Sequence, residues 1–314
     1  MKSLVTYFVI PCYNEEECLH ETTKRLENKI SELIKLKKIS PNSKIVYVDD
    51  GSVDETWATI ESFSNRIIGI KLSKNQGHQN ALLAGLMYAK NHCDIAISLD
   101  ADLQDDINAI NKFIDKYNDG AEIVYGVRSE RKKDSFFKRN TALAFYKIMD
   151  RFGAKTIYNH ADYRLMSKRA LEELSHFNEI NLFLRGIVPL IGFKTDIVKY
   201  KRAERFAGKS KYPLKKMINF ALDGITSFSV KPIRLIFTLG LLTSLISFII
   251  LIYAVIVKLI GQAVSGWTFT ICSIWLLGGL QMIALGIIGE YIGKIYTEVK
   301  GRPRYIIEKI KESK

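Results

Sequence analysis

Short apolar runs alternate with amphipathic stretches along the first 130 residues. The apolar, β-branched runs predict strands, and the stretches between them carry apolar residues at helical spacing, as in Leu19, Leu26, Ile30 and Leu33. The predicted strands are 5–10, 44–48, 67–72, 95–99 and 123–125, and the predicted helices are 18–36, a helix capped by Asp54 that runs toward Asn65, 76–91 and 107–117. This alternation predicts an α/β domain with a mainly parallel sheet covered by helices on both faces.

The second half of the chain has a different pattern. Residues 235–257 carry no charge, and neither do residues 259–289, whose helix we expect to begin at about Trp267. Each span reaches the roughly 20 residues that a helix needs to cross a bilayer, so we predict a transmembrane hairpin. Two core helices of a soluble protein are the alternative, but they are hard to bury in so small a domain. We also expect an amphipathic helix at 136–152 and an interfacial helix within 213–229.

Charge supports the membrane interpretation. The 314 residues carry a net charge of +13, yet residues 235–293 contain only one Lys and one Glu. Residues 194–234 hold 11 basic and 3 acidic side chains, and residues 294–314 hold 7 and 3, so basic blocks bracket the apolar spans. This distribution favours a membrane surface over nucleic acid as partner and predicts both termini in the cytoplasm. The four cysteines form no CxxC pair and indicate neither zinc nor disulfides.

Four polar clusters directly follow predicted strands, at 11–15, 49–52, 73–79 and 100–105. Ligands of parallel α/β sheets bind beyond the carboxyl ends of the strands. Asp100 and Asp102, one residue apart, predict a site for Mg²⁺ or Mn²⁺ bridging to a diphosphate. Two aspartates in a loop mean little alone, but here they share an edge with three other clusters. Asp50 is expected to accept hydrogen bonds from a base or ribose, with a tight turn into the next helix as the alternative.

These motifs, taken in order, carry a resemblance to a known family. The chain resembles the inverting family-2 glycosyltransferases with the GT-A nucleotide-sugar fold (Rossmann-like). Within them it is similar to the polyprenyl-phosphate glycosyltransferases, which are the bactoprenol glucosyltransferases and, more distantly, the dolichol-phosphate mannose synthases. The resemblance covers nearly the whole chain and rests on the segments PCYNE (11–15), VDDGS (48–52), DADLQ (100–104), ADYRL (161–165), RFAGKSKY (205–212) and GEYIG (289–293).

The resemblance implies a division into four parts. These are a cytoplasmic GT-A catalytic domain (1–212), a juxtamembrane interfacial helix (213–232), a two-helix transmembrane hairpin (233–294) and a basic cytoplasmic tail (295–314). It also implies roles for single residues. The nucleotide sugar is held by Pro11, Tyr13, Glu15, Asp50, Asp100 and Gln104, the metal by Asp100 and Asp102, the phosphates by Arg128 and Arg139, and the acceptor phosphate by a basic loop with Arg205, Lys209 and Lys211.

Several of these residues have simpler interpretations. For Arg128 and Arg139 the alternative is a solvated helix or loop charge. For the basic loop the alternative is attraction to anionic lipid headgroups, which does not exclude the first role. For Asp162 the resemblance implies a catalytic or positioning role beside Asp102, whereas a pair with Arg164 is the structural alternative. A lipid monophosphate has a second pKa of about 6 and is largely ionised in the cytosol, so its transfer needs no strong base. We therefore expect Asp162 to position substrate.

The resulting hypothesis is a membrane enzyme, a hexosyltransferase of the cell inner membrane. It moves one hexose from a nucleotide sugar to undecaprenyl or a related polyprenyl phosphate, and the product serves cell-envelope glycan modification. UDP-glucose is the first choice of donor, followed by UDP-N-acetylglucosamine, UDP-galactose and GDP-mannose. A processive polysaccharide synthase is an alternative, although the chain has no Arg-Trp pair, and a non-catalytic membrane scaffold is another. Small residues in the second span, Gly278, Gly279, Gly286 and Gly289, predict self-association into a homo-oligomer.

Overall fold

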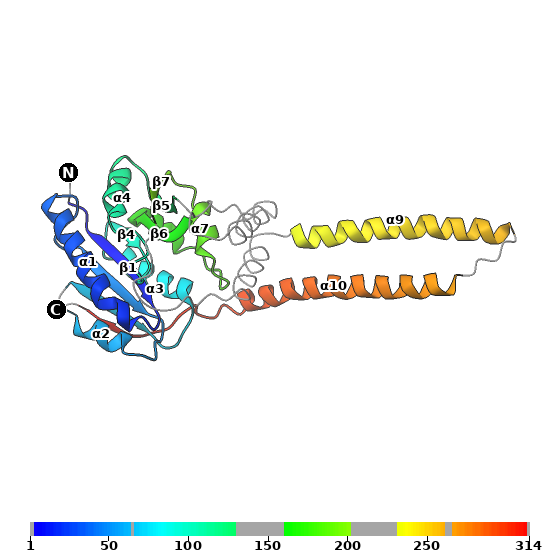
Figure 1. Cartoon of the computed structure of the whole chain (residues 1–314), viewed down its shortest axis with the longest axis horizontal. Helices are drawn as coiled ribbons and strands as arrows, with labels where there is room; N and C mark the ends of the chain where they lie inside the picture. Colours follow the sequence, from blue (N-terminus) through cyan, green and yellow to red (C-terminus); the bar gives the residue numbers. More distant parts are fainter. Residues whose placement is uncertain (1–2, 64–65, 130–159, 202–230, 261–265, 313–314) are drawn as a thin grey trace.

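The computed structural model describes residues 3–63, 66–129, 160–201, 231–260 and 266–312. An α/β domain forms one end of the molecule, and two long helices extend side by side from it (Figure 1). The helices predicted at 136–152 and 213–229 lie outside the described residues. Up to residue 128 the order of elements is β1 (Thr6–Cys12), α1 (Glu16–Lys35), β2 (Lys44–Asp49), α2 (Thr56–Ser62), β3 (Ile67–Leu72), α3 (His78–Lys90), β4 (Ile95–Ser98), α4 (Ala109–Asn118) and β5 (Ile123–Arg128).

The predicted strand–helix alternation is confirmed over this region, with one local difference. The helix predicted from Asp54 begins at Thr56. The Asp54 carboxylate accepts the backbone N–H of Thr56 at 3.1 Å, so it closes a turn just ahead of the helix.

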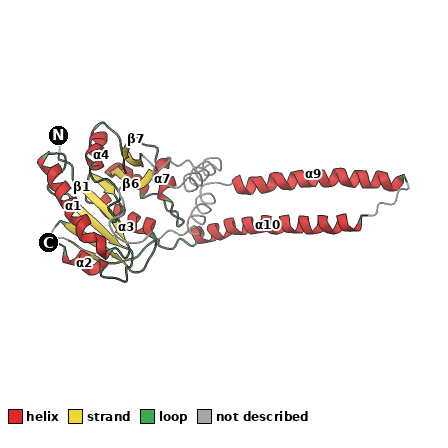
Figure 2. Ribbon diagram, in the orientation of Figure 1, coloured by secondary structure: helices red, strands yellow, loops and turns green. Residues whose placement is uncertain are grey.

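Four further elements follow where the hydrophobic pattern is irregular. They are β6 (His160–Ser167), α6 (Lys168–Leu174), α7 (Leu184–Leu190) and β7 (Thr195–Tyr200). Together with β8 (Ile307–Lys311) they complete an eight-stranded sheet in the order β7-β5-β6-β4-β1-β2-β3-β8. Figure 2 shows the strands of the domain between flanking helices.

The sheet is mixed. The central strands β3, β2, β1 and β4 are mutually parallel, as predicted. β6 lies antiparallel between β4 and β5, and β8 pairs antiparallel with β3 at one edge. The parallel centre matters for function because it places the ends of β1, β2 and β4 at one edge of the sheet.

Alternate residues of the central strands point to opposite faces and are buried on both. Phe8 and Ile10 of β1 pack with α1, α2 and α4, whereas Val9 packs with α3, α6 and α7. Gly85 allows α3 to lie directly on the sheet, since a Cβ there would stand 2.4 Å from Val9 Cγ1 and 2.7 Å from Val48 Cγ2. This two-sided burial explains why the strands are continuous apolar runs rather than alternating ones.

The two long helices are α9 (Lys231–Leu259) and α10 (Trp267–Val299). In the part of the chain that the structure describes, the stretch Leu276–Val299 of α10 is long and apolar enough to cross a membrane by length and composition. The apolar stretch found in α9, Leu235–Ile250, is shorter. The expectation of two spans is thus met by one helix, and the span in α9 stays a prediction.

The segment 295–314, predicted as a basic tail, is built differently in the structure. α10 continues to Val299, and the chain after it returns to the α/β domain, where residues 307–311 form β8. Lys309 pairs with Glu61 on α2 at 2.5 Å, and Lys71 pairs with Glu308 at 3.0 Å. The segment therefore contains a strand that the sequence did not indicate, and the partners in each of these two ion pairs lie more than 200 residues apart in the chain.

Candidate active site

The polar clusters that follow β1 and β2 interlock. The N–H of Asn14 donates to Ser52 Oγ at 2.9 Å, and the Asn14 side-chain oxygen accepts from the N–H of Val53 at 3.0 Å. The N–H of Glu15 donates to Thr56 Oγ1 at 2.9 Å. Asn14 has a φ of 52°, which turns the chain sharply away from the strand. The turn after β1 is therefore fixed by side chains of the turn after β2.

Three of the predicted donor-binding residues lie in this first turn. Pro11 is buried within β1, Glu15 is half-buried, and the Tyr13 side chain is 38 % exposed. A half-exposed aromatic ring beside two strand ends suits stacking on a planar base. The structure brings the three together, and their contact with a nucleotide stays a prediction.

Asp50 lies in the turn that follows β2. It is buried, and its two carboxylate oxygens accept the backbone N–H groups of Gln76 at 2.7 Å and Gly77 at 2.9 Å. Burial raises the pKa of Asp50, and these two hydrogen bonds act against the rise. Gly51 next to it has a φ of +67°, and a Cβ there would lie 2.6 Å from the carbonyl carbon of Lys74. Asp50 thus holds the 73–77 loop in place, a role that the sequence did not indicate.

Asp100 and Asp102 stand at the end of β4. Asp102 is 6 % exposed, and its Oδ1 accepts the N–H of Gln104 at 3.1 Å. Leu103, which lies between Asp102 and Gln104, has a φ of 58°, and this left-handed conformation turns the chain back toward Asp102. The Ala101 carbonyl is held by the Thr22 hydroxyl of α1 at 2.8 Å. Asp100 is less enclosed, with 32 % of its side chain exposed. The predicted pair of carboxylates is therefore in place at the predicted edge.

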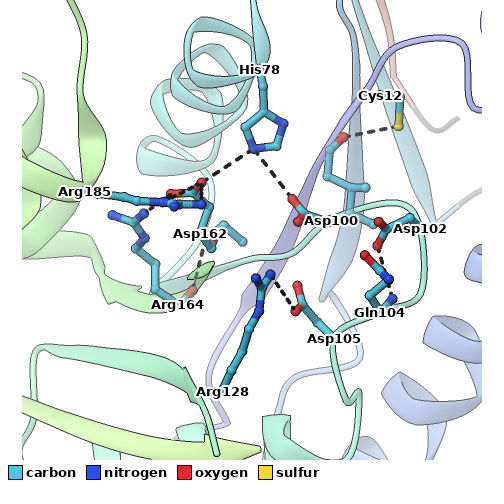
Figure 3. A network of polar contacts seen from close by, with 12 residues as sticks. Cys12, His78, Asp100, Asp102, Gln104, Asp105, Arg128, Asp162, Arg164 and Arg185 are labelled. Atoms are coloured by element: carbon cyan, nitrogen blue, oxygen red, sulfur yellow. Dashed lines mark hydrogen bonds and ion pairs between the residues drawn. The ribbon is translucent and has the colours of Figure 1, made fainter. Parts of the chain in front are cut away.

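A third acidic residue of the 100–105 loop, Asp105, was not singled out by the sequence. Asp105 is 4 % exposed, and the Tyr200 hydroxyl donates to its Oδ1 at 2.6 Å. A guanidinium nitrogen of Arg128 lies 4.0 Å from the same oxygen, and Arg128 Nε donates to the Tyr200 hydroxyl at 3.4 Å. Burial, with the neighbouring Asp100 carboxylate, raises the pKa of Asp105 to about 6. Arg128 is thereby oriented toward the acidic loop, as Figure 3 shows.

Asp162 on β6 is the centre of a buried ionic network. It is 7 % exposed and pairs with Arg164 and Arg185, with Arg185 Nη2 at 2.9 Å from Oδ2. Burial alone would raise the pKa of Asp162, but the charges of Arg185 and Arg164 outweigh it and hold this pKa far below its ordinary value. His78 Nε2 stands between Asp162, at 3.8 Å, and Asp100, at 3.6 Å (Figure 3).

This network combines the two interpretations of Asp162. The carboxylate does pair with Arg164, yet His78 connects it to the Asp100 loop. The Asp162 carboxylate is ionised and paired with the guanidinium groups of Arg164 and Arg185, so it is a weak base and suits a positioning role. His78 and Arg185 were missed by sequence reasoning. Arg185 does carry a signal, since it is a lone charge in the apolar run 182–191.

The acidic loop fits a divalent ion that shares its coordination with phosphate oxygens. Among the described residues, no three His, Cys, Asp or Glu side chains form an all-protein metal cage. Mg²⁺ and similar ions usually take only one or two carboxylates together with substrate phosphates and water. Asp100 and Asp102 supply the two carboxylates. The buried Asp105 Oδ2 has no hydrogen-bond partner within the described part of the chain and is a further oxygen in the same loop. The donor set therefore suits such an ion.

The remaining predicted site residues lie outside the described residues. They are Arg139, Arg205, Lys209 and Lys211. Their roles stay predictions.

A mixed sheet with a parallel centre, an Asp-x-Asp loop and an arginine directed at that loop is the arrangement of a nucleotide-sugar transferase of the GT-A class. Residues 7–175 match the family model Glycosyl transferase family 2, which covers more than half of the chain. The chain belongs to this family and is a glycosyltransferase.

Relatives match over nearly the full length. Glycosyltransferase YkoT of Bacillus subtilis (strain 168) is 58 % identical over 97 % of this chain and 91 % of its own. The prophage bactoprenol glucosyl transferase homolog of Escherichia coli (strain K12) is 40 % identical over 97 % of this chain and 98 % of its own. The bactoprenol glucosyl transferase of Shigella phage SfII is 40 % identical over 96 % of each. The likeness thus continues beyond the family domain through both long helices.

Proposed function

We propose that this protein transfers a single hexose from a nucleotide sugar, with UDP-glucose as first choice, to a polyprenyl phosphate. The observation that carries the proposal is the 40 % identity to bactoprenol glucosyl transferases over 96–97 % of the chain. Because that likeness extends through α9 and α10, it concerns the membrane-proximal part and not only the nucleotide-sugar domain.

In the proposed reaction, a phosphate oxygen of the acceptor attacks the anomeric carbon of the sugar while its bond to the diphosphate oxygen breaks. The anomeric configuration inverts, and a nucleoside diphosphate leaves. Asp100 and Asp102 would hold Mg²⁺ or Mn²⁺, which neutralises charge on the leaving diphosphate when bound. Arg128, oriented by Tyr200 and Asp105, adds positive charge at the same edge.

No group in this scheme has to remove a proton. The acceptor phosphate is already largely ionised near neutral pH, since its second pKa is about 6. Asp162 is ionised and balanced by two guanidinium groups. We assign it the role of holding Arg185 and His78 in place beside the Asp100 loop, so catalysis rests on alignment and charge compensation.

The topology supports a membrane hairpin. β8 follows α10 and pairs with β3, which precedes α9, so both ends of the helical pair lie on the side of the catalytic domain. A chain with this pairing crosses a membrane either twice or not at all. We propose two crossings with the catalytic domain and both termini in the cytoplasm, since the flanks of the pair are basic. Self-association through the small residues of α10 remains part of the proposal.

The test is transfer of radiolabel into polyprenyl phosphate by the full-length protein. The donors are UDP-glucose, UDP-N-acetylglucosamine, UDP-galactose and GDP-mannose, each with Mg²⁺, with Mn²⁺ and with EDTA. We expect metal-dependent label in the lipid fraction from one donor. Asp102→Asn should abolish it, and Asp115→Asn, a control on the exposed face of α4, should leave it unchanged. Label from no donor would refute the proposal, and a polymeric product would favour a synthase.

A further inference from the structure

α10 is longer than the hydrocarbon core of a membrane is thick. The helix has 33 residues, or about 50 Å at 1.5 Å per residue, whereas the hydrocarbon core is about 30 Å thick. Its charged residues, Glu290, Lys294 and Glu298, are confined to the last three turns. The last turns of α10 therefore stand next to the catalytic domain as rigid helix.

Glu298 binds a loop of that domain. Its Oε2 accepts the backbone N–H of Ile180 and its Oε1 accepts the backbone N–H of Asn181, both at 2.9 Å. Six residues later along the C-terminal segment, Arg304 Nη1 donates to the Phe177 carbonyl at 2.7 Å. Hydrogen bonds between a carboxylate and backbone N–H groups are stronger than neutral ones, and two parallel bonds also fix direction.

The same loop leads directly to the active site. Leu184 donates its N–H to Gln79 Oε1 at 2.7 Å and accepts from buried Arg164 at 3.4 Å. The next residue is Arg185, which pairs with Asp162. Only three residues lie between Asn181 and Arg185, so their Cα atoms are at most about 14 Å apart. The position of the Arg185 backbone is therefore set from one side by Glu298 and from the other by the β6 network.

We propose that Glu298 is a positioning residue for the transfer reaction. By holding Ile180 and Asn181 against α10, it fixes the positions of Arg185 and Asp162 relative to this helix. α7, which begins at Leu184, lies on the side of the domain from which α9 and α10 extend (Figure 1). The inference rests on the proposed function, because an acceptor held in the membrane must meet a donor held by the soluble domain at a fixed height.

A purely structural role of Glu298, in which it only attaches the domain to α10, predicts a different result. If Glu298 only attached the domain to α10, its loss would lower stability, or have no effect while β8 holds the domain. Positioning requires that the turnover number kcat falls while donor binding and folding are kept. A misplacement of about 1 Å costs up to a hundredfold in rate.

The test compares Glu298→Gln with wild type and with Glu173→Gln, an exposed glutamate on α6. Gln keeps the shape of Glu but turns one acceptor oxygen into a donor that faces a backbone N–H. The full-length proteins are placed in phospholipid vesicles containing polyprenyl phosphate. For Glu298→Gln we expect kcat to fall at least tenfold, KM for the nucleotide sugar to change less than twofold, and the thermal midpoint to stay within about 2 °C. Glu173→Gln should match wild type.

A second readout does not depend on activity. Hydrogen exchange of residues 176–186, followed by mass spectrometry, should be faster in Glu298→Gln, including at Arg185, and unchanged in Glu173→Gln. Glu298→Asp, which keeps the charge but is one methylene shorter, should be intermediate in both readouts and serves if the Gln variant does not fold. An unchanged kcat in an active preparation, a loss that follows the thermal midpoint, or unchanged exchange at 182–186 would overturn the inference. An inactive wild type refutes the proposed function instead, and the exchange arm then still tests the contact.

Discussion

Replacing Asp162 by Asn should reveal how the β6 network is balanced. The substitution keeps the shape of the side chain but removes the charge between two guanidinium groups. Arg164 is 1 % exposed and would keep its charge without a counterion. Removing one partner of a buried ion pair costs about 3–5 kcal/mol, because the remaining charge stays desolvated.

Arg185→Gln is the matched control from the other end of the same network. The Arg185 side chain is 31 % exposed, and its removal leaves Asp162 paired with Arg164. A partly solvated pair contributes about 1 kcal/mol. The structure therefore predicts an asymmetry of at least about 2 kcal/mol between two variants that break the same contact.

Thermal unfolding of the purified full-length protein at pH 7.5 measures this asymmetry. For a domain of this size 1 kcal/mol shifts the midpoint by about 2–4 °C. Asp162→Asn should lower the midpoint by about 6–20 °C, and Arg185→Gln by about 2–4 °C. Equal shifts for the two variants, or an unchanged midpoint in Asp162→Asn, would show that Arg164 finds compensation elsewhere and would refute the reasoning.

Three further outcomes follow from the site. Gly51→Ala should lower the thermal midpoint and raise KM for the donor more than Gly77→Ala does; both glycines have positive φ, which costs about 1 kcal/mol for Ala, but only at Gly51 would a Cβ meet backbone within 3 Å. Asp105, with a pKa of about 6 in the folded state against about 4 unfolded, binds its proton more tightly when folded, so its contribution is present below pH 4 and lost as the pH rises through 6. Asp105→Asn should therefore be more stable than wild type at pH 8, by up to about 3 kcal/mol, and the gap should close toward pH 4; a pH-independent difference in urea unfolding would contradict this. Asp102→Asn should weaken Mn²⁺ binding at least tenfold in calorimetry with nucleotide present, and an unchanged affinity would remove Asp102 from the metal site.

The N-terminal half of the fold was predictable because each element there carries its own pattern. Continuous apolar runs mark strands buried on both faces, and the polar clusters that end them mark the ligand edge. Asp100 and Asp102 were found in this way, and so was Asp50, although its observed role is to hold the 73–77 loop.

β6 shows why the rest was harder. Ala161, Tyr163 and Leu165 alternate with Asp162 and Arg164, a pattern that normally indicates one solvated face. Both faces are buried here, because the buried Asp162 carboxylate forms ion pairs with Arg164 and with Arg185. A hydrophobic pattern alone does not predict that a charged side chain is buried, because it does not show whether that charge is paired inside the protein.

β8 was missed for a different reason. It pairs with β3 across more than 230 residues, and no local spacing indicates which distant strand a short segment joins. The sequence indicated its basic character, but the acidic partner of Lys309, Glu61 on α2, became visible only in the assembled sheet.

The pairing of β8 with β3 also imposes an order on biosynthesis. Along the chain, β8 leaves the ribosome only after both long helices, so the edge of β3 stays open until α9 and α10 have been synthesised. An open strand edge is a template for pairing with other chains. The catalytic domain thus reaches its closed form only once α10 has been made, and with the proposed membrane hairpin this would link maturation of the enzyme to arrival in the bilayer. Shortening the chain after α10 would leave a catalytic sheet that is complete in its active-site residues yet prone to aggregate.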